Sequence, residues 1–496
     1  MNARLFRTNL LALACLAALP AARAAHVDQR VLDADVADAL IVFEAAPAST
    51  PPLAPDADYK LHRRALVERL RAHADASQRD VRAWLDAHAI PYRSYWIANV
   101  IQARLPRAAV DALASRGDIA RIEPNVRIAM RLPQPEPAAR NPAAPEAISW
   151  GVAKIDAPAA WALGDTGQGV VIAGEDTGIQ WDHPALQPHY RGWDGATAVH
   201  DYNWHDSIHD AAAGNACGSD SPFPCDDHVH GTHTAGTFIG DDGATHQTGV
   251  APGAKWIGCR NMDGGVGTPA RYIECMQWML APTDANGANP NPDLAPDVIS
   301  NSWGCPVSEG CTVGDELEGT VENVVAGGIF FVASAANEGP ACETIVKPPA
   351  TYDASFVVGA TNSADQIASY SSRGPVVASA LIRPDIAAPG SSVISSEPPS
   401  TYGSLSGTSM AAPHVSGTAA LVMSMNPALK GHPAEVAAIL RATTVTDGIT
   451  DPSNTGCGGL TMADWPNYQA GYGRLDALAA VIAADTLFAD GFDTAP

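Results

Sequence analysis

The chain has 496 residues, 46% apolar and 17% charged, and its 30 Lys and Arg against 54 Asp and Glu give a net charge of −24. This composition is too hydrophobic and too sparsely charged for a disordered chain. The acidic surplus argues against a nucleic-acid-binding protein, whose contact surface is basic. The charge is also uneven, because residues 1–25 carry three Arg and no acid, residues 26–140 are nearly neutral, and residues 141–496 carry a net charge of −28. We therefore expect three segments that are processed differently after synthesis.

Residues 1–25 are predicted to be a cleaved signal peptide. Arg4 and Arg7 precede an apolar stretch, and residues 22–24 form the small-x-small pattern of a signal-peptidase site. The apolar stretch is too short to span a bilayer. The alternative, an N-terminal core helix, would end abruptly at Pro20. We therefore expect a secreted protein, with the periplasm as the alternative compartment.

Residues 26–131 are predicted to form a small α+β domain. Hydrophobic periodicity indicates strands near 40–43, 94–105 and 119–122 and helices near 59–88 and 107–116. Residues 132–149 follow with five Pro, which is typical of an exposed linker open to proteolysis.

Residues 150–484 alternate apolar strands with stretches of helical length. This alternation predicts an α/β fold with a doubly wound, mostly parallel sheet flanked by helices. Catalytic groups in such sheets collect at the carboxyl ends of the strands. Residues 485–496 are a tail whose role the sequence does not assign. The strands are expected at 170–175, 255–260, 297–301, 328–334, 355–360 and 385–388, and the helices at 268–280, 315–327, 409–425 and 433–442.

Eight of the nine Cys lie after the linker. An even number in an exported chain favours disulfides over a metal site, and the alternative zinc site lacks a C-x-x-C. The predicted pairs are Cys305 with Cys311, which flank a turn-like segment, and Cys217 with Cys225. The other four allow three pairings, and they are Cys259, Cys275, Cys342 and Cys457.

Three short stretches carry candidate chemistry. Asp176 ends an apolar strand, His230 precedes a run rich in Gly and Thr, and Ser409 begins a predicted helix of small residues. The unpaired N–H groups of a helix start favour a nearby oxyanion. A serine hydroxyl becomes a nucleophile when a His oriented by a carboxylate takes its proton. The alternative, that Ser409 is an ordinary N-cap, explains neither Asp176 nor the histidines.

Other hydrolase classes fit the spacing poorly. His228, His230 and His233 suggest zinc, but no Glu stands between them as in H-E-x-x-H, so we interpret His228 and His233 as structural. Asp-Thr-Gly, the tripeptide of aspartic peptidases, recurs at 165–167 and 176–178, too close together for one copy in each of two lobes. The nucleophile elbow of α/β-hydrolases requires an acid and then a His after the Ser, and no acid lies between Ser409 and the histidines that follow it.

The order Asp176, His230, Ser409 and the residues around each resemble the three signature motifs of the subtilisin-like serine peptidases, over residues of about 150–480. The resemblance implies that Asp176 orients the imidazole, that His230 is the general base and then acid, and that Ser409 forms the acyl-enzyme. Residues 331–339 resemble the family's oxyanion-hole segment, with Asn337 as the donor. Ala336 stands where the family usually has Gly, which would tighten the wall of the substrate pocket.

Longer stretches, among them SNSWGCP and KPPATYDASFVVGAT, resemble the bacillopeptidase F branch of this family. The resemblance implies that residues 26–131 are an inhibitor-like propeptide, cut off in or near 132–149 to give a mature start at Ser149 or up to about ten residues earlier. The alternative is a permanent N-terminal domain. The resemblance also implies a substrate-binding set of Ser302, Trp303, Gly304, Ala335 and Ala336.

The expected function is that of a secreted, self-processed serine endopeptidase. Its partners would be protein or peptide substrates and its own propeptide, as inhibitor and folding aid, with no nucleic acid and no membrane. No cofactor is expected to be required. Calcium is common in the family, but no acidic loop in this sequence has the ligand spacing of a calcium site. Lys347 lies near the implied base of the first substrate pocket and favours acidic side chains unless Glu338 neutralises it. The alternative is a catalytically inactive binding or adhesion protein on the same scaffold.

Overall fold

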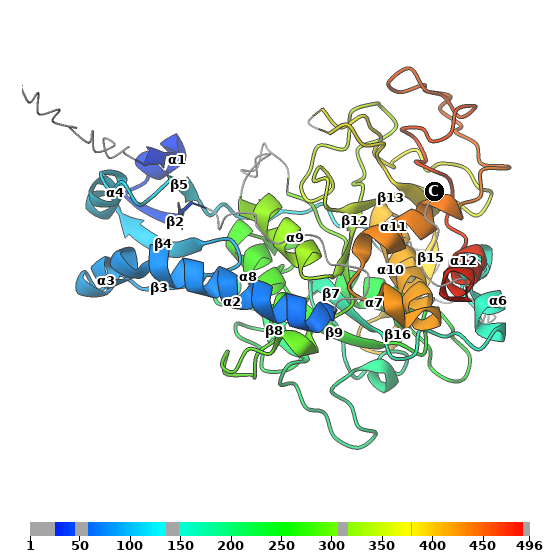
Figure 1. Cartoon of the computed structure of the whole chain (residues 1–496), viewed down its shortest axis with the longest axis horizontal. Coiled ribbons are helices and arrows are strands. Elements are labelled where there is room, and N and C mark those ends of the chain that lie inside the picture. The colour runs from blue at the N-terminus through cyan, green and yellow to red at the C-terminus, as the bar shows by residue number, and fades with distance from the viewer. Residues whose placement is uncertain (1–24, 45–57, 135–147, 306–315, 378, 490–496) are drawn as a thin grey trace, which may run out of the picture.

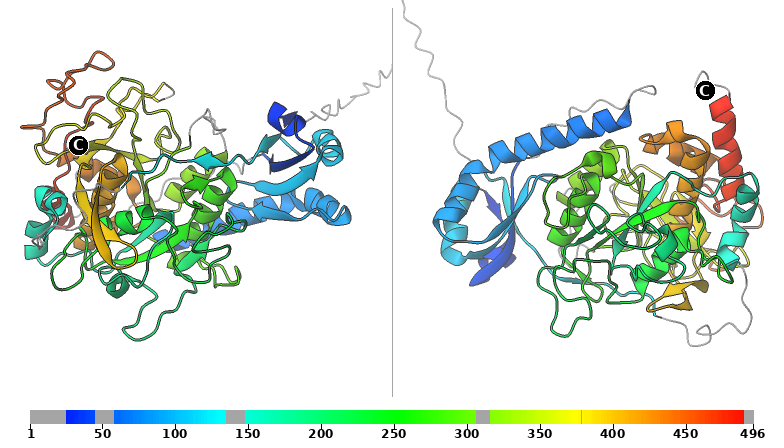
Figure 2. Two further views of the ribbon diagram at one scale, coloured as in Figure 1. Left: turned by 180° about the vertical axis from the view of Figure 1, so that it is seen from behind. Right: turned by 90° about the horizontal axis from the view of Figure 1, so that it is seen from below.

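The computed structural model describes residues 25–44, 58–134, 148–305, 316–377 and 379–489. A smaller N-terminal unit lies at one end of a larger α/β unit, and one long helix of the smaller unit runs along the larger one (Figures 1 and 2). The predicted signal peptide, the predicted tail beyond residue 489 and most of the predicted linker lie outside the described residues.

The N-terminal unit is built on a five-stranded sheet of order β1-β5-β2-β4-β3, in which β1 and β5 are parallel and the other pairs antiparallel. One face of this sheet packs on its own helices around Ile41, Leu85 and Leu113. The other face, with Leu40 and Val100, joins a core cluster of the larger unit. Its strands are β1 (His26–Val27), β2 (Val36–Val42), β3 (Tyr92–Tyr95), β4 (Val100–Pro106) and β5 (Arg121–Pro124), and its helices α1 (Gln29–Leu32), α2 (Tyr59–Ser77), α3 (Arg79–Ala87) and α4 (Arg107–Ala114).

The larger unit contains a seven-stranded sheet of order β14-β13-β12-β11-β7-β9-β8, and every pairing in it is parallel. This confirms the predicted mostly parallel α/β architecture. β7 lies near the middle, between β11 and β9. The strands are β7 (Val171–Asp176), β8 (Trp204–Asp206), β9 (Lys255–Arg260), β11 (Val298–Asn301), β12 (Phe330–Ser334), β13 (Phe356–Thr361) and β14 (Ile386–Pro389).

Helices cover both faces of this sheet. On one face Ile172 of β7 packs with residues of α7 (His230–Ile239) and α10 (Thr408–Met425). On the other face Ala173 packs with α8 (Pro269–Leu280) and α9 (Glu316–Ala326). Successive side chains of a strand point to opposite faces, so each central strand is buried on both sides. The remaining elements are α5 (Trp150–Lys154), α6 (Ala157–Ala162), α11 (Pro433–Ala442), α12 (Ala477–Ala489), the hairpin β15 (Val393–Glu397) and β16 (Thr401–Leu405), the pair β6 (Ile128–Ala129) and β10 (Val266–Gly267), and short 3₁₀ turns that include η2 (Pro292–Leu294).

Two predicted elements of the N-terminal unit are wrong in extent. The single strand expected at 94–105 is a hairpin, because Asn99 takes a positive φ of 53° in the turn between β3 and β4. The single helix expected at 59–88 is two helices, which meet at the fully buried Gln78. In the larger unit, α12 continues past the predicted domain end at residue 484.

Three disulfides lie among the described residues, namely Cys217–Cys225, Cys259–Cys275 and Cys342–Cys457. The first confirms a predicted pair, and the other two select one of the three pairings left open. Cys305 is also disulfide-bonded. Its predicted partner, Cys311, lies outside the described residues.

Candidate active site

Asp176 and His230 form a buried pair at the carboxyl edge of the sheet. Asp176 ends β7, and His230 begins α7. The imidazole Nδ1 lies 2.8 Å and 2.9 Å from the two carboxylate oxygens, and neither side chain is more than 3% exposed. The backbone N–H of Thr177 donates to the same carboxylate at 2.7 Å. These contacts fix the ring so that its other nitrogen, Nε2, is directed away from Asp176.

Ser409 lies in the first turn of α10, which packs against α7. Its Oγ donates to the carbonyl oxygen of Ser302 at 3.2 Å, and Ser302 Oγ donates to the Ser409 carbonyl at 3.0 Å. His230 Nε2 is buried and has no hydrogen-bond partner among the described residues. A hydrogen bond between Ser409 and His230 therefore requires the serine side chain to turn away from Ser302. Such bonds are commonly absent before substrate binds and form only in the complex.

Asn337 lies beside the start of α10. Its Oδ1 accepts from the backbone N–H of Thr408 at 2.9 Å and from Thr408 Oγ1 at 3.0 Å. Because the oxygen is held on the helix, the Nδ2 amide is the end left to donate. Ala336, just before it, has a positive φ of 75°. That conformation favours glycine, and an alanine in it is strained by about 1–2 kcal/mol.

A cavity of about 360 Å³ opens beside Ser409. Four of the five predicted substrate-binding residues line it, whereas Ala335 is fully buried in a small apolar cluster. Trp303 stacks on Tyr272 with the ring centroids 3.8 Å apart and the planes nearly parallel. The described residues that line the cavity are Met130, Arg131, Leu132, Pro133, Ser302, Trp303, Gly304, Ser334, Ala336, Asn337, Glu338, Lys347 and Ser409.

Lys347 and Glu338 form an ion pair in the wall of this cavity. Glu338 also accepts a hydrogen bond from Ser372 Oγ at 3.4 Å. The pairing places opposite charges side by side, so these two residues together add little net charge to the cavity wall. The sequence left open whether Glu338 neutralises Lys347, and the geometry supports neutralisation.

The N-terminal chain enters the cavity. β6 pairs antiparallel with β10, and the N–H of Met130 donates to the Gly265 carbonyl at 2.9 Å. Pro133 lies so close to Gly407 that a Cβ added there would lie 3.0 Å from its ring. Residues 128–129 therefore form a short strand, and residues 130–133 lead from it along the cavity beside Ser409. The sequence patterns did not reveal this path because its contacts join segments far apart in the chain.

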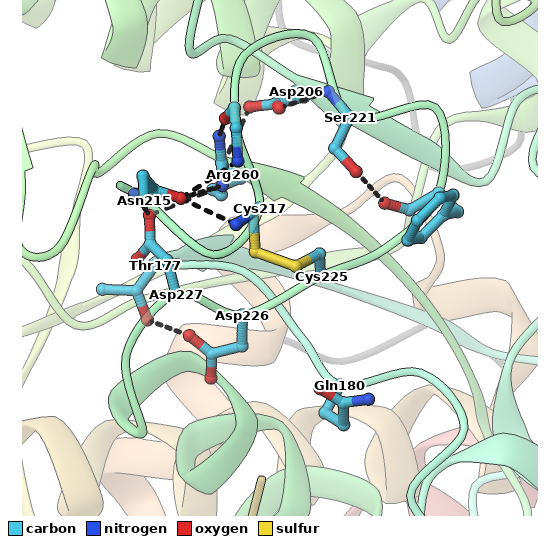
Figure 3. The surroundings of a disulfide bond; sticks show 12 residues. Thr177, Gln180, Asp206, Asn215, Cys217, Ser221, Cys225, Asp226, Asp227 and Arg260 are labelled. Carbon is cyan, nitrogen blue, oxygen red and sulfur yellow. Dashed lines mark hydrogen bonds and ion pairs between the residues drawn. A yellow bond between two sulfur atoms is a disulfide. The ribbon is translucent and has the colours of Figure 1, made fainter. Parts of the chain in front are cut away.

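Asp226 braces the residues next to the Asp176–His230 pair. Its carboxylate accepts from Thr177 Oγ1 at 2.8 Å and from Thr232 N and Oγ1 at 2.9 and 2.5 Å. Burial raises the pKa of Asp226 to about 7, although these hydrogen bonds oppose the rise. The adjacent Cys217–Cys225 disulfide closes the loop that presents Asp226 (Figure 3). Asp226 was missed by sequence reasoning, because an Asp four residues before a His has no distinctive pattern.

The other two histidines of this region have structural contacts. His233 is buried, and its Nε2 lies 3.0 Å from the carbonyl oxygen of Val393. Burial lowers the pKa of His233 to about 3, so it stays neutral. His228 Nδ1 accepts from the backbone N–H of His230 at 3.2 Å. No group of three or more His, Cys, Asp or Glu among the described residues is arranged to hold a metal ion.

Comparison with known proteins agrees with this arrangement. The sequence profile of the Subtilase family matches residues 167–469, which is more than half of the chain. The chain is 36% identical to bacillopeptidase F of Bacillus subtilis over 438 residues, covering 85% of this chain but 29% of that protein. It is 34% identical to subtilisin of Bacillus pumilus over 284 residues, covering 57% of this chain and 86% of that protein, and similarly to subtilisin Savinase of Lederbergia lenta over 283 residues, again 57% and 86%. The chain therefore belongs to the subtilase family of serine peptidases.

Proposed function

We propose that this chain is an endopeptidase in which Asp176, His230 and Ser409 form a catalytic triad. The observation that carries the proposal is the buried pair of Asp176 and His230, with imidazole Nε2 left without a partner among the described residues, beside a cavity that contains Ser409 at a helix start. The chain spans less than a third of bacillopeptidase F, so the proposed activity refers to the residues present here.

The chemistry follows from these positions. His230 Nε2 takes the proton of Ser409 as Oγ bonds to the substrate carbonyl carbon, and Asn337 Nδ2 donates to the oxyanion that forms. Collapse of the tetrahedral intermediate breaks the C–N bond, and His230 returns the proton to the leaving amine. Water then hydrolyses the ester by the same steps. Asp176 holds the imidazole in the tautomer with Nε2 unprotonated and stabilises its charged form.

Covalent labelling tests the proposal against the alternative of an inert scaffold. A fluorophosphonate reacts only with an activated serine, so the processed protein should label at Ser409, identified by mass spectrometry of the labelled peptide. Heat-unfolded protein is the control and should not react. Folded protein freed of residues 26–131 that fails to label would support the alternative of a catalytically inactive binding or adhesion protein.

The oxyanion role of Asn337 predicts a loss confined to turnover. Asn337→Ala should lower kcat about 10²–10³-fold, the size known for such a donor in subtilisin, a member of the same family. KM should change less than about twofold, because the donor acts on charge that develops only in the transition state. Steady-state kinetics on a peptide substrate measure both constants. Asn362→Ala, which alters a turn outside the cavity, is the control, and a rise in KM alone would contradict the assignment.

We also propose that the enzyme cuts its own chain within residues 130–134. Residues 128–129 pair with β10, and residues 130–133 line the cavity that contains Ser409, as a substrate strand added to a sheet edge would. Later trimming would bring the new N-terminus to Ser149, whose N–H donates to the Gln247 carbonyl at 2.8 Å. Residues 26–131 would then be a propeptide that blocks the cleft until it dissociates.

Helix α2 of the proposed propeptide contacts the larger unit through two adjacent arginines, and we expect them to contribute unequally to its binding. Arg63 is 1% exposed and its Nε donates to the Gly327 carbonyl, just after α9, at 2.6 Å. Arg64 makes an exposed ion pair with Asp293. Arg63→Leu should speed propeptide release about 30- to 1000-fold, the range for losing a buried interface arginine, whereas Arg64→Leu should have little effect. The lag before activity rises after precursor cleavage measures release, and equal lags in the two variants would contradict this assignment.

The ion pair in the cavity wall supports a preference for uncharged substrate side chains. Lys347→Met would leave Glu338 without this ion pair. For substrates with Arg or Lys in this pocket, kcat/KM should then rise about three- to tenfold relative to substrates with Leu there. Glu338→Gln should favour acidic side chains instead. Cleavage profiles across a peptide library measure both ratios, and unchanged profiles would place the determinant of specificity elsewhere.

Secretion is proposed on the pattern of residues 1–25 and on the disulfides, which form and persist in oxidising compartments. In the part of the chain that the structure describes, no helix is both long and apolar enough to cross a bilayer. The periplasm remains the alternative compartment. We propose no required cofactor and no calcium ligands.

A further inference from the structure

A second acid lies directly beside Asp176, on the opposite face of the sheet. Glu175 is fully buried, and β7 alternation directs it toward α8 and α9 while Asp176 faces α7. A carboxylate in such a place normally has a cationic partner, because burying an unpaired charge is very costly. Among the described residues Glu175 has no ion pair, and the hydrogen bond that it accepts comes from a side-chain amide.

That amide belongs to Asn261, which contacts both acids. Asn261 Nδ2 donates to Glu175 Oε1 at 2.9 Å, and the Asn261 backbone N–H donates to the Asp176 carbonyl at 2.9 Å. Asn261 directly follows β9, so it ties the ends of β7 and β9 together.

Asn301 stands on the other side of Glu175. The parallel register of β11 and β7 pairs Asn301 with Glu175, so both side chains lie on one face. Asn301 Nδ2 donates to the Val332 carbonyl at 3.1 Å, which leaves its Oδ1 to accept. Yet Asn301 Oδ1 and Glu175 Oε2 are both buried without a partner among the described residues. Two acceptors cannot satisfy each other, but one proton on Glu175 converts Oε2 into a donor.

We propose that Glu175 is a positioning residue, held as a neutral carboxylic acid that accepts from Asn261 and donates to Asn301. This brace joins the ends of β9, β7 and β11. β7 ends at Asp176, and β11 is followed directly by Ser302, whose carbonyl and hydroxyl both bond Ser409. Glu175 thereby sets the spacing between the Asp176–His230 pair and Ser409. The inference rests on the proposed triad.

The surrounding charges agree with a neutral acid. Burial raises the pKa of Glu175 well above its ordinary value, and the charge of Asp176 adds to the rise. On β9, Arg260 is engaged by Asp206 and Asp227. On α8, Glu274 is bonded to His205 and His209, and Cys275 is tied to Cys259 of β9 in a disulfide. A neutral Glu175 also keeps a second negative charge away from the catalytic pair.

Activity of two replacements tests the brace. Glu175→Leu removes both bonds and should lower kcat about 10- to 100-fold with KM within about twofold, the usual cost of losing an outer partner of a site. Glu175→Gln can accept from Asn261 and donate to Asn301, so it should restore most of the lost turnover. Asp165→Leu is the matched control, because Asp165 is another buried acid but lies before the start of β7, and it should lower Tm and leave kcat unchanged. Wild-type kcat in Glu175→Leu, or no rescue by Gln, would overturn the brace.

Thermal unfolding of the uncut full chain tests the protonation state without any need for activity. In a Ser409→Ala background, Glu175→Gln and Glu175 chains are compared from pH 4 to pH 8. An acid with a raised pKa stabilises the fold below its unfolded pKa and loses that stability as pH rises toward its folded pKa. The Tm advantage of Gln should therefore grow with pH by a few degrees. An advantage that stays constant or shrinks would mean an ionised Glu175.

Fluorophosphonate labelling separates the two proposals. If processed wild type does not label, the proposed triad is wrong. Equal labelling rates in wild type and Glu175→Leu would contradict the brace alone.

Discussion

Ser409→Ala is expected to abolish both peptide hydrolysis and processing of the precursor. Loss of the nucleophile in subtilisin, a member of the same family, costs about 10⁶ in turnover, and the residual rate comes from substrate binding and the oxyanion donor. Because residues 130–133 already line the cavity beside Ser409, the same serine should also make the cut that releases the N-terminal unit. Purified Ser409→Ala chain should therefore remain full length on a gel while wild type shortens.

Ser416→Ala is the matched control. Ser416 lies on the same helix, is buried, and its Oγ donates to the Ala412 carbonyl at 3.3 Å, outside the cavity. This variant should process and hydrolyse peptide like wild type. If purified Ser409→Ala still matured, self-cleavage would be wrong even though the triad itself could stand. If Ser409→Ala retained hydrolysis, the assignment of the nucleophile would be wrong.

Asp176→Asn is expected to lower kcat about 10⁴-fold with little change in overall structure. An Asn side chain carries no charge and replaces one carboxylate oxygen with an NH₂ donor. Both carboxylate oxygens of Asp176 lie within 2.9 Å of imidazole Nδ1, so the Asn amide can donate to an unprotonated Nδ1. The imidazole then takes the tautomer with its proton on Nε2, which cannot accept the proton of Ser409. The size is that known for the same change in a serine peptidase triad. Peptide hydrolysis at neutral pH measures the loss.

Asp182→Asn provides the comparison for this change. Asp182 is an exposed acid that accepts from Gln180 Nε2 at 2.6 Å and has no contact with the imidazole of His230 in the described structure. Its replacement removes the same charge from the same loop and should change kcat less than about twofold. A similar loss in both variants would assign the effect to net charge rather than to the orientation of His230.

Local patterns were sufficient to predict the α/β architecture and to select Asp176, His230 and Ser409 as the proposed triad. Central parallel strands such as β9 are continuous apolar runs, so their positions follow from local composition. Local patterns were insufficient where the backbone turns within a predicted strand, as between β3 and β4, where Asn99 has a positive φ. The hairpin of β15 and β16 was missed because its sequence is rich in Ser and lacks a clear alternation.

The sequence by itself determined the family, the order of Asp176, His230 and Ser409, and the Cys217–Cys225 pair, because each rests on residue types within a short window. Only the tertiary structure decided the contacts between distant windows. These include the Cys342–Cys457 disulfide, the ion pair that neutralises Lys347, the segment of residues 130–133 in the cavity, and the buried Glu175 between Asn261 and Asn301. The physical reason is that burial, hydrogen-bond partners and charge state depend on which parallel strands become neighbours. No local sequence pattern specifies the order of the strands in the sheet.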